Sequence, residues 1–303
     1  MNLEKNPISQ PFHSGFVGVL GRPNVGKSTL VNTIIGDKVS IVSHKPQTTR
    51  CRILGILTRS DAQICFIDAP GIHRPQENLH KIMVKTAMGS LDESDCIVLM
   101  VPPSKPGESE ALIIDLIKRV SKPVILAINK VDQVQKEIIL PLIDAYSKYY
   151  EFAHIVPISA LRKTNIDSLL SAIISLLPEE SPLFPEDMKT DRSEIFQIAE
   201  LIREKVFIHT HKEIPYSAGV IIEEMKLNPK NSVTSIHAII LVERTSHKGI
   251  IIGKQGTKLR TIGQQARLEI EKLIQTKVFL DLRVKCVPDW KKTPHLLSKM
   301  GLL

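Results

Sequence analysis

Short apolar runs alternate with amphipathic stretches through the first part of the chain. The apolar runs are FVGVLG, QICFIDAPG, CIVLMV, PVILAINK and HIVPISA, and stretches with helical spacing lie between them. Buried strands that alternate with helices predict a mostly parallel sheet with helices on both faces. Ligands of such sheets bind at the carboxyl ends of the strands, so polar motifs at the ends of these runs are candidate site residues.

The pattern changes after a proline-rich stretch, Pro178 to Pro185, which predicts a linker. The stretch PEDMKTDRSEIFQIAELIREKVFIHT then has the spacing of a capped amphipathic helix. Two predicted strands follow, SAGVIIEEMKL and SIHAIILVER, and after them come the loop IIGKQG, a helix to about Lys272 and the strand KVFLDLRVKCV. The predicted order is helix, strand, strand, short helix, loop, helix, strand. The apolar face of the first helix is predicted from Ile195, Ile198, Ile202 and Phe207.

Composition places the chain among folded proteins of two ordinary domains. It has 303 residues, of which 43% are hydrophobic and 24% charged. The longest apolar runs are shorter than the ~18 residues of a membrane span, and the N-terminus lacks the pattern of a signal peptide. The cysteines are far apart and form no CxxC pair, so we expect small buried residues in a reducing compartment. They are Cys51, Cys65, Cys96 and Cys286.

The positive charge is concentrated at the end of the chain. Residues 244–303 contain 13 Lys and Arg against 4 Asp and Glu, whereas residues 1–180 contain 20 against 18. Two interpretations stand, a solubilising face and a surface for a polyanionic partner. The concentration of charge in an ordered-looking segment favours the polyanion.

The segment GRPNVGKST ends the first apolar run and begins a helical pattern. It contains GxxxxGKS, in which glycines let backbone N–H groups approach a phosphate at a helix N-terminus. Lys27 is predicted to contact the β- and γ-phosphates, and the Ser28 hydroxyl to bind Mg²⁺. The predicted phosphate loop is Gly21, Arg22, Pro23, Asn24, Val25, Gly26, Lys27, Ser28 and Thr29.

Three further motifs end later apolar runs. DAPG supplies a carboxylate, Asp68, for Mg²⁺ through water, and a glycine N–H, Gly71, near a γ-phosphate. NKVD supplies Asp132, whose carboxylate matches the two N–H donors of guanine, with Lys130 along the base. In ISA, the Ala160 N–H is predicted to bind the guanine carbonyl oxygen. Four motifs in this order predict a guanine nucleotide site, whose other residues are Ala69, Pro70, Ile72, Asn129, Val131 and Ser159.

These motifs resemble the Ras-like translation-factor class of GTPases. The resemblance implies hydrolysis of GTP to GDP and phosphate, with the segment QTTR as the first switch. Thr48 or Thr49 closes over Mg²⁺ in that class, and Thr49 is favoured here. The implied catalytic residues are Lys27, Thr49 and Gly71, and the implied magnesium ligands are Ser28, Thr49 and Asp68.

One position departs from the Ras pattern. Where Ras-type proteins have a glutamine that orients water, this chain has Ile72, which predicts slow intrinsic hydrolysis. His73 and Arg74 are nearby polar candidates whose geometry the sequence does not define. Asn24 matches the asparagine that binds potassium in some GTPases of this class, and a local hydrogen-bonding role fits it equally well.

The second glycine loop, IIGKQG, lacks the serine of a phosphate loop and follows a helical KGI segment. A GxxG between two helices on a three-stranded sheet resembles the K-homology (KH) RNA-binding arrangement. There the glycines admit a sugar-phosphate backbone beside a groove for about four unpaired bases. A helix-capping loop without RNA is the alternative. The predicted RNA-binding residues are Lys248, Ile252, Gly253, Lys254, Gln255, Gly256, Lys258 and Arg260.

Both halves together resemble the Era family of bacterial ribosome-assembly GTPases. The resemblance covers essentially the whole chain, including FPEDMKTDRSEIF and IIGKQGTKLRTIGQQAR. It implies an α/β Ras-like P-loop GTPase domain followed by an α+β KH domain. The expected boundaries are a tail at 1–15, the GTPase domain at 16–178, a linker at 179–192, the KH domain at 193–287 and a tail at 288–303.

The same resemblance implies partners and a location. The partners are the 3′ region of small-subunit ribosomal RNA and a precursor of the 30S subunit, and the expected action is in subunit assembly and rRNA maturation. A monomer is expected in the cytoplasm, with a peripheral fraction at the inner membrane. Two rival hypotheses are a metabolite kinase, which NKVD disfavours, and a membrane-acting GTPase whose tail contains Trp290, Lys291 and Lys292.

Overall fold

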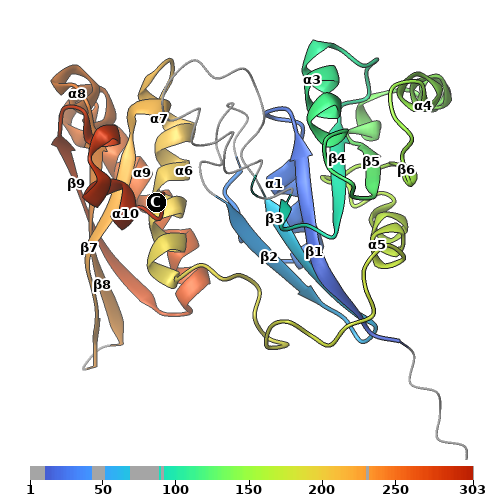
Figure 1. Ribbon diagram of the computed structural model, residues 1–303. Coiled ribbons are helices and arrows are strands. Elements are labelled where there is room, and N and C mark those ends of the chain that lie inside the picture. Colours follow the sequence, from blue (N-terminus) through green and yellow to red (C-terminus); the bar gives the residue numbers. More distant parts are fainter. Residues whose placement is uncertain (1–10, 43–51, 69–88, 90–91, 230–231, 303) are drawn as a thin grey trace, which may run out of the picture. The chain divides into compact units, whose positions relative to one another are not determined.

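The structure, a computed structural model, describes residues 11–42, 52–68, 89, 92–229 and 232–302. These residues form two compact units. The first consists of residues 11–40, 52–68, 89 and 92–191, and the second mainly of residues 192–302 (Figure 1). Within the described residues, no helix is both long and apolar enough to cross a membrane.

The first unit contains a six-stranded sheet of order β2-β3-β1-β4-β5-β6. Among the strands that the structure describes, only β2 and β3 pair antiparallel, so the prediction of a mostly parallel sheet is confirmed. The strands are β1 (His13–Gly21), β2 (Ile53–Thr58), β3 (Ala62–Asp68), β4 (Cys96–Val101), β5 (Val124–Ile128) and β6 (His154–Pro157).

Helices cover both faces of this sheet. The helices α1 (Lys27–Ile35) and α5 (Ile166–Ile174) pack on one face, and α3 (Glu108–Ile117) and α4 (Ile139–Ser147) pack on the other. Two short 3-10 helices, η1 (Val131–Gln133) and η2 (Lys136–Ile138), follow β5. The stretch with helical spacing between the second and third apolar runs, residues 79–91, lies outside the described residues, apart from residue 89.

The stretch predicted as a linker packs against the first unit. The side chain of Gln63 in β3 is fully buried and accepts hydrogen bonds from the backbone of Leu183 and Phe184. Phe184 and Met188 cover apolar residues of β2 and β3, and the Ile56 amide donates to the Lys189 carbonyl at 2.9 Å. This part of the chain therefore protects a face and an edge of the sheet.

The second unit has the predicted order of elements with one addition, a short helix at Ile214–Ser217 that was not predicted. They are α6 (Glu194–His209), α7 (Ile214–Ser217), β7 (Gly219–Asn228), β8 (Val233–Val242), α8 (Thr245–Ile252), η3 (Lys254–Gly256), α9 (Thr257–Ile274) and β9 (Lys277–Cys286). The sheet has order β7-β8-β9, with β7 antiparallel and β9 parallel to β8. Ile198, Ile202 and Phe207 of α6 are buried as predicted, whereas Ile195 is 51% exposed. The prediction for Ile195 was wrong because Ile195 lies in the first turn of α6, before the part of the helix whose apolar side chains are buried.

The C-terminal segment folds onto the second sheet. It contains η4 (Trp290–Lys292) and α10 (Pro294–Lys299), and Trp290, Leu297 and Met300 form a buried cluster with Ile221 and Leu241. The Trp290 indole N–H donates to the Ser217 carbonyl at 3.0 Å. A Cβ at position 219 would lie 2.6 Å from the terminal methyl of Met300 and 2.9 Å from the Trp290 ring, so a side chain there would force this cluster to shift.

Candidate functional site

Strand register brings three of the sequence motifs to one edge of the first sheet. Val19, two residues before the end of β1, pairs with Asp68 at the end of β3. Gly21 pairs with Met100 of β4, and Ile128 at the end of β5 pairs with Val101. The phosphate loop, DAPG and NKVD therefore all begin at the carboxyl edge of the sheet (Figure 1).

The backbone of the phosphate loop is possible only with glycine at two positions. Gly21 has φ 149°, and a Cβ there would lie 2.5 Å from the Met100 carbonyl oxygen. Gly26 has φ 110°, and a Cβ there would lie 2.4 Å from the Asn129 side-chain nitrogen. Gly26 precedes the first residue of α1, so the loop leads directly into the positive end of a helix dipole.

Lys27 is buried beneath the loop. Its ammonium group donates to the carbonyl oxygens of Gly21 at 3.1 Å and Arg22 at 3.3 Å. Burial lowers the pKa of the Lys27 ammonium to about 8, while the nearby Asp68 carboxylate acts in the opposite direction. The buried ammonium is thus held by two carbonyl oxygens of the loop, which phosphate oxygens can replace.

Ser28 and Asp68 form the pair of oxygen donors predicted for Mg²⁺. The Ser28 hydroxyl donates to Asp68 Oδ2 at 2.6 Å. Asp68 Oδ1 is buried and accepts no hydrogen bond from the described residues. Burial raises the pKa of the Asp68 carboxyl, although Lys27, Ser28 and Ser40 act against this rise. A buried carboxylate oxygen without a donor, beside a serine hydroxyl, fits a small hard cation that prefers oxygen ligands.

The base side of the site is joined to the phosphate loop. The Asn129 side chain donates to the Val25 carbonyl at 2.8 Å, and Lys130 Nζ donates to the Asn24 carbonyl at 2.8 Å. Lys130 has φ 67°, in the left-handed region. Ser159 donates to Asp132 Oδ1 at 2.6 Å. NKVD and ISA therefore meet each other and the loop.

Two contacts differ from the roles expected from sequence. The Ala160 amide, expected to face a guanine oxygen, donates to Asn129 Oδ1 at 2.9 Å. Arg22 forms an ion pair of 3.5 Å with Glu110, a buried residue of α3 that sequence analysis did not select. The signal for Glu110 was its position three residues after Gly107, because it also accepts a hydrogen bond from the Gly107 amide and caps α3.

Part of the predicted site belongs to segments that the structure does not describe. The residues Thr48, Thr49, Ala69, Pro70, Gly71 and Ile72 lie outside the described residues, as do His73, Arg74 and Cys51. Of the other cysteines, Cys65 and Cys96 are buried and Cys286 is partly buried. Burial raises the pKa of the Cys65 and Cys96 thiols to about 12, so both are unreactive near neutral pH.

The second glycine loop has the backbone that the GxxG hypothesis requires. Gly253 follows α8 with φ 73° and ψ 175°, and Gly256 precedes α9 with φ 75°. A Cβ at Gly253 would lie 2.8 Å from Lys258 Cβ. The Thr257 hydroxyl donates to the Lys254 carbonyl at 2.9 Å and closes the turn. The loop therefore connects two helices, unlike the phosphate loop, which follows a strand.

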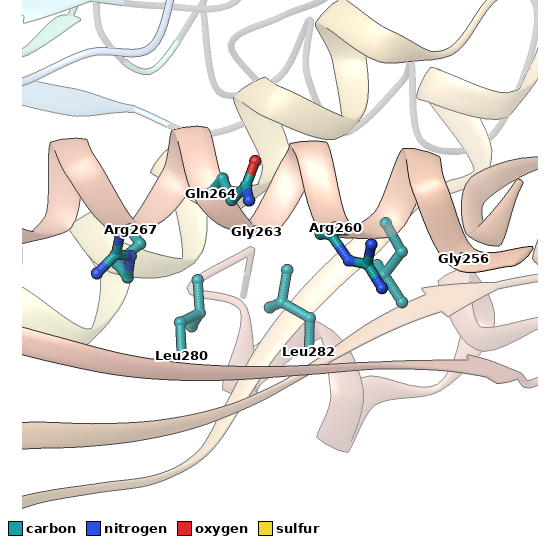
Figure 2. A pocket seen from close by; sticks show the side chains of 8 residues that line it. Gly256, Arg260, Gly263, Gln264, Arg267, Leu280 and Leu282 are labelled. Carbon is teal, nitrogen blue, oxygen red and sulfur yellow. The ribbon is translucent and has the colours of Figure 1, made fainter.

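A groove of about 350 Å³ lies between α9 and β9 beside this loop (Figure 2). Arg260 and Arg267 extend from α9, and Leu280 and Leu282 extend from β9 toward the helix. Of the predicted RNA-binding residues, only Gly256 and Arg260 line the groove. Its other lining residues are Leu259, Gly263, Gln264, Arg267, Leu280 and Leu282, which share one helix face and alternate positions of a strand. That spacing was the signal in the sequence by which these groove residues could have been found.

Comparisons with known proteins give two family matches. Residues 16–130 match the 50S ribosome-binding GTPase model, and residues 213–291 match a KH domain model. Both matches agree with the order of the two units.

Similar proteins extend these matches over nearly the whole chain. The GTPase Era of Halothermothrix orenii is 49% identical, with 96% of this chain and 98% of that protein covered. The GTPase Era of Syntrophus aciditrophicus is 47% identical, with 96% and 95% covered. A crystal structure of Era in complex with MgGDPNP and nucleotides 1506–1542 of 16S ribosomal RNA has a TM-score of 0.93 and 43% identity, with 96% and 99% covered. The chain is a GTPase with a C-terminal KH domain and belongs to the Era family.

Proposed function

We propose that the protein hydrolyses GTP slowly and binds single-stranded RNA near the 3′ end of small-subunit ribosomal RNA. Its action is in small-subunit assembly and rRNA maturation, with a 30S precursor as the partner. The observation that carries the proposal is a guanine nucleotide site in one unit and a basic GxxG groove in the other. The similar Era protein bound to MgGDPNP and a 16S ribosomal RNA segment supports this pairing.

The chain's own groups have separate tasks at the GTP site. Lys27 exchanges its two carbonyl partners for phosphate oxygens and stabilises their negative charge. Ser28 and Asp68 hold Mg²⁺, which when bound neutralises charge on the β- and γ-phosphates. Asp132, oriented by Ser159, selects guanine by accepting two hydrogen bonds. Ile72 at the water-orienting position accounts for a slow rate.

Potassium is proposed as an additional ion at the phosphate loop. Asn24 has φ 62°, and its carbonyl oxygen accepts a hydrogen bond from Lys130 at the base side. A monovalent cation here would add positive charge near the β–γ bridge. We expect faster turnover in potassium than in sodium and no such difference in Asn24→Ala. Equal wild-type rates in the two salts would remove potassium from the proposal without affecting GTP binding.

The proposed location is cytoplasmic, with a peripheral fraction held at the inner membrane by charge. Lys292 is exposed and paired only with Asp289 among the described residues, while Trp290 and Leu297 are buried and cannot insert into lipid as they stand. Sedimentation with anionic vesicles should therefore disappear at high salt. Salt-resistant sedimentation would contradict a contact based on charge.

The RNA assignment is tested by crosslinking in cells and sequencing of the attached RNA. We expect reads to accumulate at the 3′ end of small-subunit rRNA in wild type and to be lost in Arg260→Glu/Arg267→Glu. Both arginines line the groove, and reversal of their charge repels the phosphate backbone. Reads that accumulate on other RNAs, or that persist in the variant, would contradict the proposal.

A further inference from the structure

Strand β9 has a different chemistry on each of its faces. It forms the edge of its sheet and pairs only with β8, so its outer backbone edge has no neighbouring strand within the described residues. Leu280 and Leu282 point into the groove (Figure 2). Because strand side chains alternate, Lys277, Phe279 and Arg283 lie on the opposite face. The two faces are therefore separated by the width of a single strand.

Phe279 is an unusually exposed aromatic residue. All eight phenylalanines of the chain lie within the described residues, and Phe279 alone among them is exposed, at 59%. A single exposed apolar side chain is common on soluble proteins, so exposure alone indicates little. The charged groups around the ring indicate which kind of ligand could bind there.

The surroundings of Phe279 are basic once local ion pairs are considered. Asp281 contacts His237 at 3.2 Å and Arg283 at 3.1 Å, and Glu224 pairs with Lys226, so both carboxylates are compensated. Lys277 and Lys285, two residues on the same face of β9, have no ion-pair partner in the part of the chain that the structure describes.

The C-terminal segment covers a different part of this face. Trp290 and its neighbours pack on Ile221 and Leu241, and Leu241 pairs with Lys285 near the end of β9. Phe279 pairs instead with Ser235, six residues earlier along β8. An exposed ring two residues from Lys277, with Asp281 and Glu224 held in ion pairs, is an arrangement on which single-stranded nucleic acid can stack a base.

We infer that an RNA strand leaving the groove crosses the open edge of β9 and stacks one base on Phe279, with Lys277 and Lys285 contacting phosphates. This inference rests on the RNA binding proposed above and extends it to a second site on the other face of the same strand. The occupant is single-stranded RNA because a duplex offers no unstacked base to the ring.

The test compares a short RNA with a longer one. One RNA has about four nucleotides, the length that a GxxG groove holds, and the other about twelve, both taken from the 3′ end of 16S rRNA. Phe279→Ala should weaken binding of the longer RNA at least about fivefold and change the shorter one less than about twofold. Leu227→Ala is the matched control, because Leu227 is also 59% exposed but lies on β7 at the other edge. It should change neither affinity.

Fluorescence gives an independent measurement. Trp290, the one native tryptophan, is fully buried, so new emission in Phe279→Trp reports on position 279. The longer RNA should quench it and the shorter one should not. Unchanged affinity in Phe279→Ala together with unquenched emission would overturn the inference while leaving the groove proposal intact. Failure of wild type to bind the longer RNA would overturn both.

Discussion

At the scale of single residues, charge and burial at the nucleotide site are closely linked. Lys27 and Asp68 are both buried, and burial shifts the pKa of each toward its neutral form. A nucleotide with Mg²⁺ supplies the opposite charge that each group needs. Ligand binding should therefore change the protonation of the site, and pH should change ligand affinity.

The first prediction concerns Lys27 and pH. Without nucleotide its pKa is about 8, below its ordinary value, and only the charged ammonium binds phosphate. Affinity for GDP should therefore be nearly full at pH 7, fall as pH rises through 8, and reach about a quarter of its pH 7 value at pH 8.5. Calorimetry in two buffers of different ionisation enthalpy should show uptake of about 0.8 proton at pH 8.5. No proton uptake at that pH would contradict the assignment.

The second prediction concerns the choice of base. Asp132→Asn should weaken GTP binding about 100-fold or more, because two charge-assisted hydrogen bonds are lost, and should transfer preference to xanthosine triphosphate. Ser159→Ala removes only the group that orients Asp132 and should weaken GTP without that transfer. Competition titrations with GTP, xanthosine triphosphate and ATP measure both. A wild type that binds ATP as tightly as GTP would disprove the role of NKVD.

At the scale of elements, helices and strands with a strong hydrophobic periodicity were predictable from the sequence, and those with a weak periodicity were not. The alternation of strands and helices was confirmed in the first unit, as was the order of elements around GxxG. Strand β2, the antiparallel partner of β3, was not predicted. Only Arg59 to Asp61 separate its short apolar run from β3, so the two strands look like one segment with a polar interruption. The packing of α10 was also missed, since six residues are too few to show a helical period.

The site was predictable where a motif has a required backbone shape. Gly21, Gly26 and Gly253 have left-handed or otherwise restricted φ values that their motifs require. Side-chain partners from distant parts of the chain were not predictable. The Ala160 amide donating to Asn129, and Glu110 pairing with Arg22, depend on how strand ends meet in space. No local pattern contains that information.

The third prediction concerns the C-terminal segment as a structural element. Trp290→Ala should destabilise the second unit by about 3–5 kcal/mol, because it removes a fully buried ring and its hydrogen bond to Ser217. Leu140→Ala, at a position 75% exposed in α4, should change stability by less than about 0.5 kcal/mol. Thermal unfolding measured with and without GDP distinguishes the two units, because GDP binding should raise the unfolding temperature of the first unit only. Equal stability of Trp290→Ala and wild type would show that the segment is a free tail.

At the scale of the whole molecule, the two chemistries occupy different units. Every described residue proposed to contact nucleotide lies between Gly21 and Ala160, and the described residues of the RNA groove lie between Gly256 and Leu282. The excess positive charge also belongs to the last 60 residues of the sequence. A substitution in one site can therefore be expected to leave the chemistry of the other in place, even where ligands of the two sites influence each other.

The most direct test measures RNA and GTP affinity on the same Gly253→Asp variant. Its side chain would approach Lys258 and put negative charge where the RNA backbone passes. Arg260→Glu/Arg267→Glu, which changes no restricted backbone position, serves as the second variant in case the first is unstable. We predict that both lose binding of the longer 16S RNA and keep GTP affinity within about twofold of wild type. Two results would contradict the account of two separate sites. One is RNA binding that survives in both variants, and the other is GTP affinity that is lost together with RNA binding.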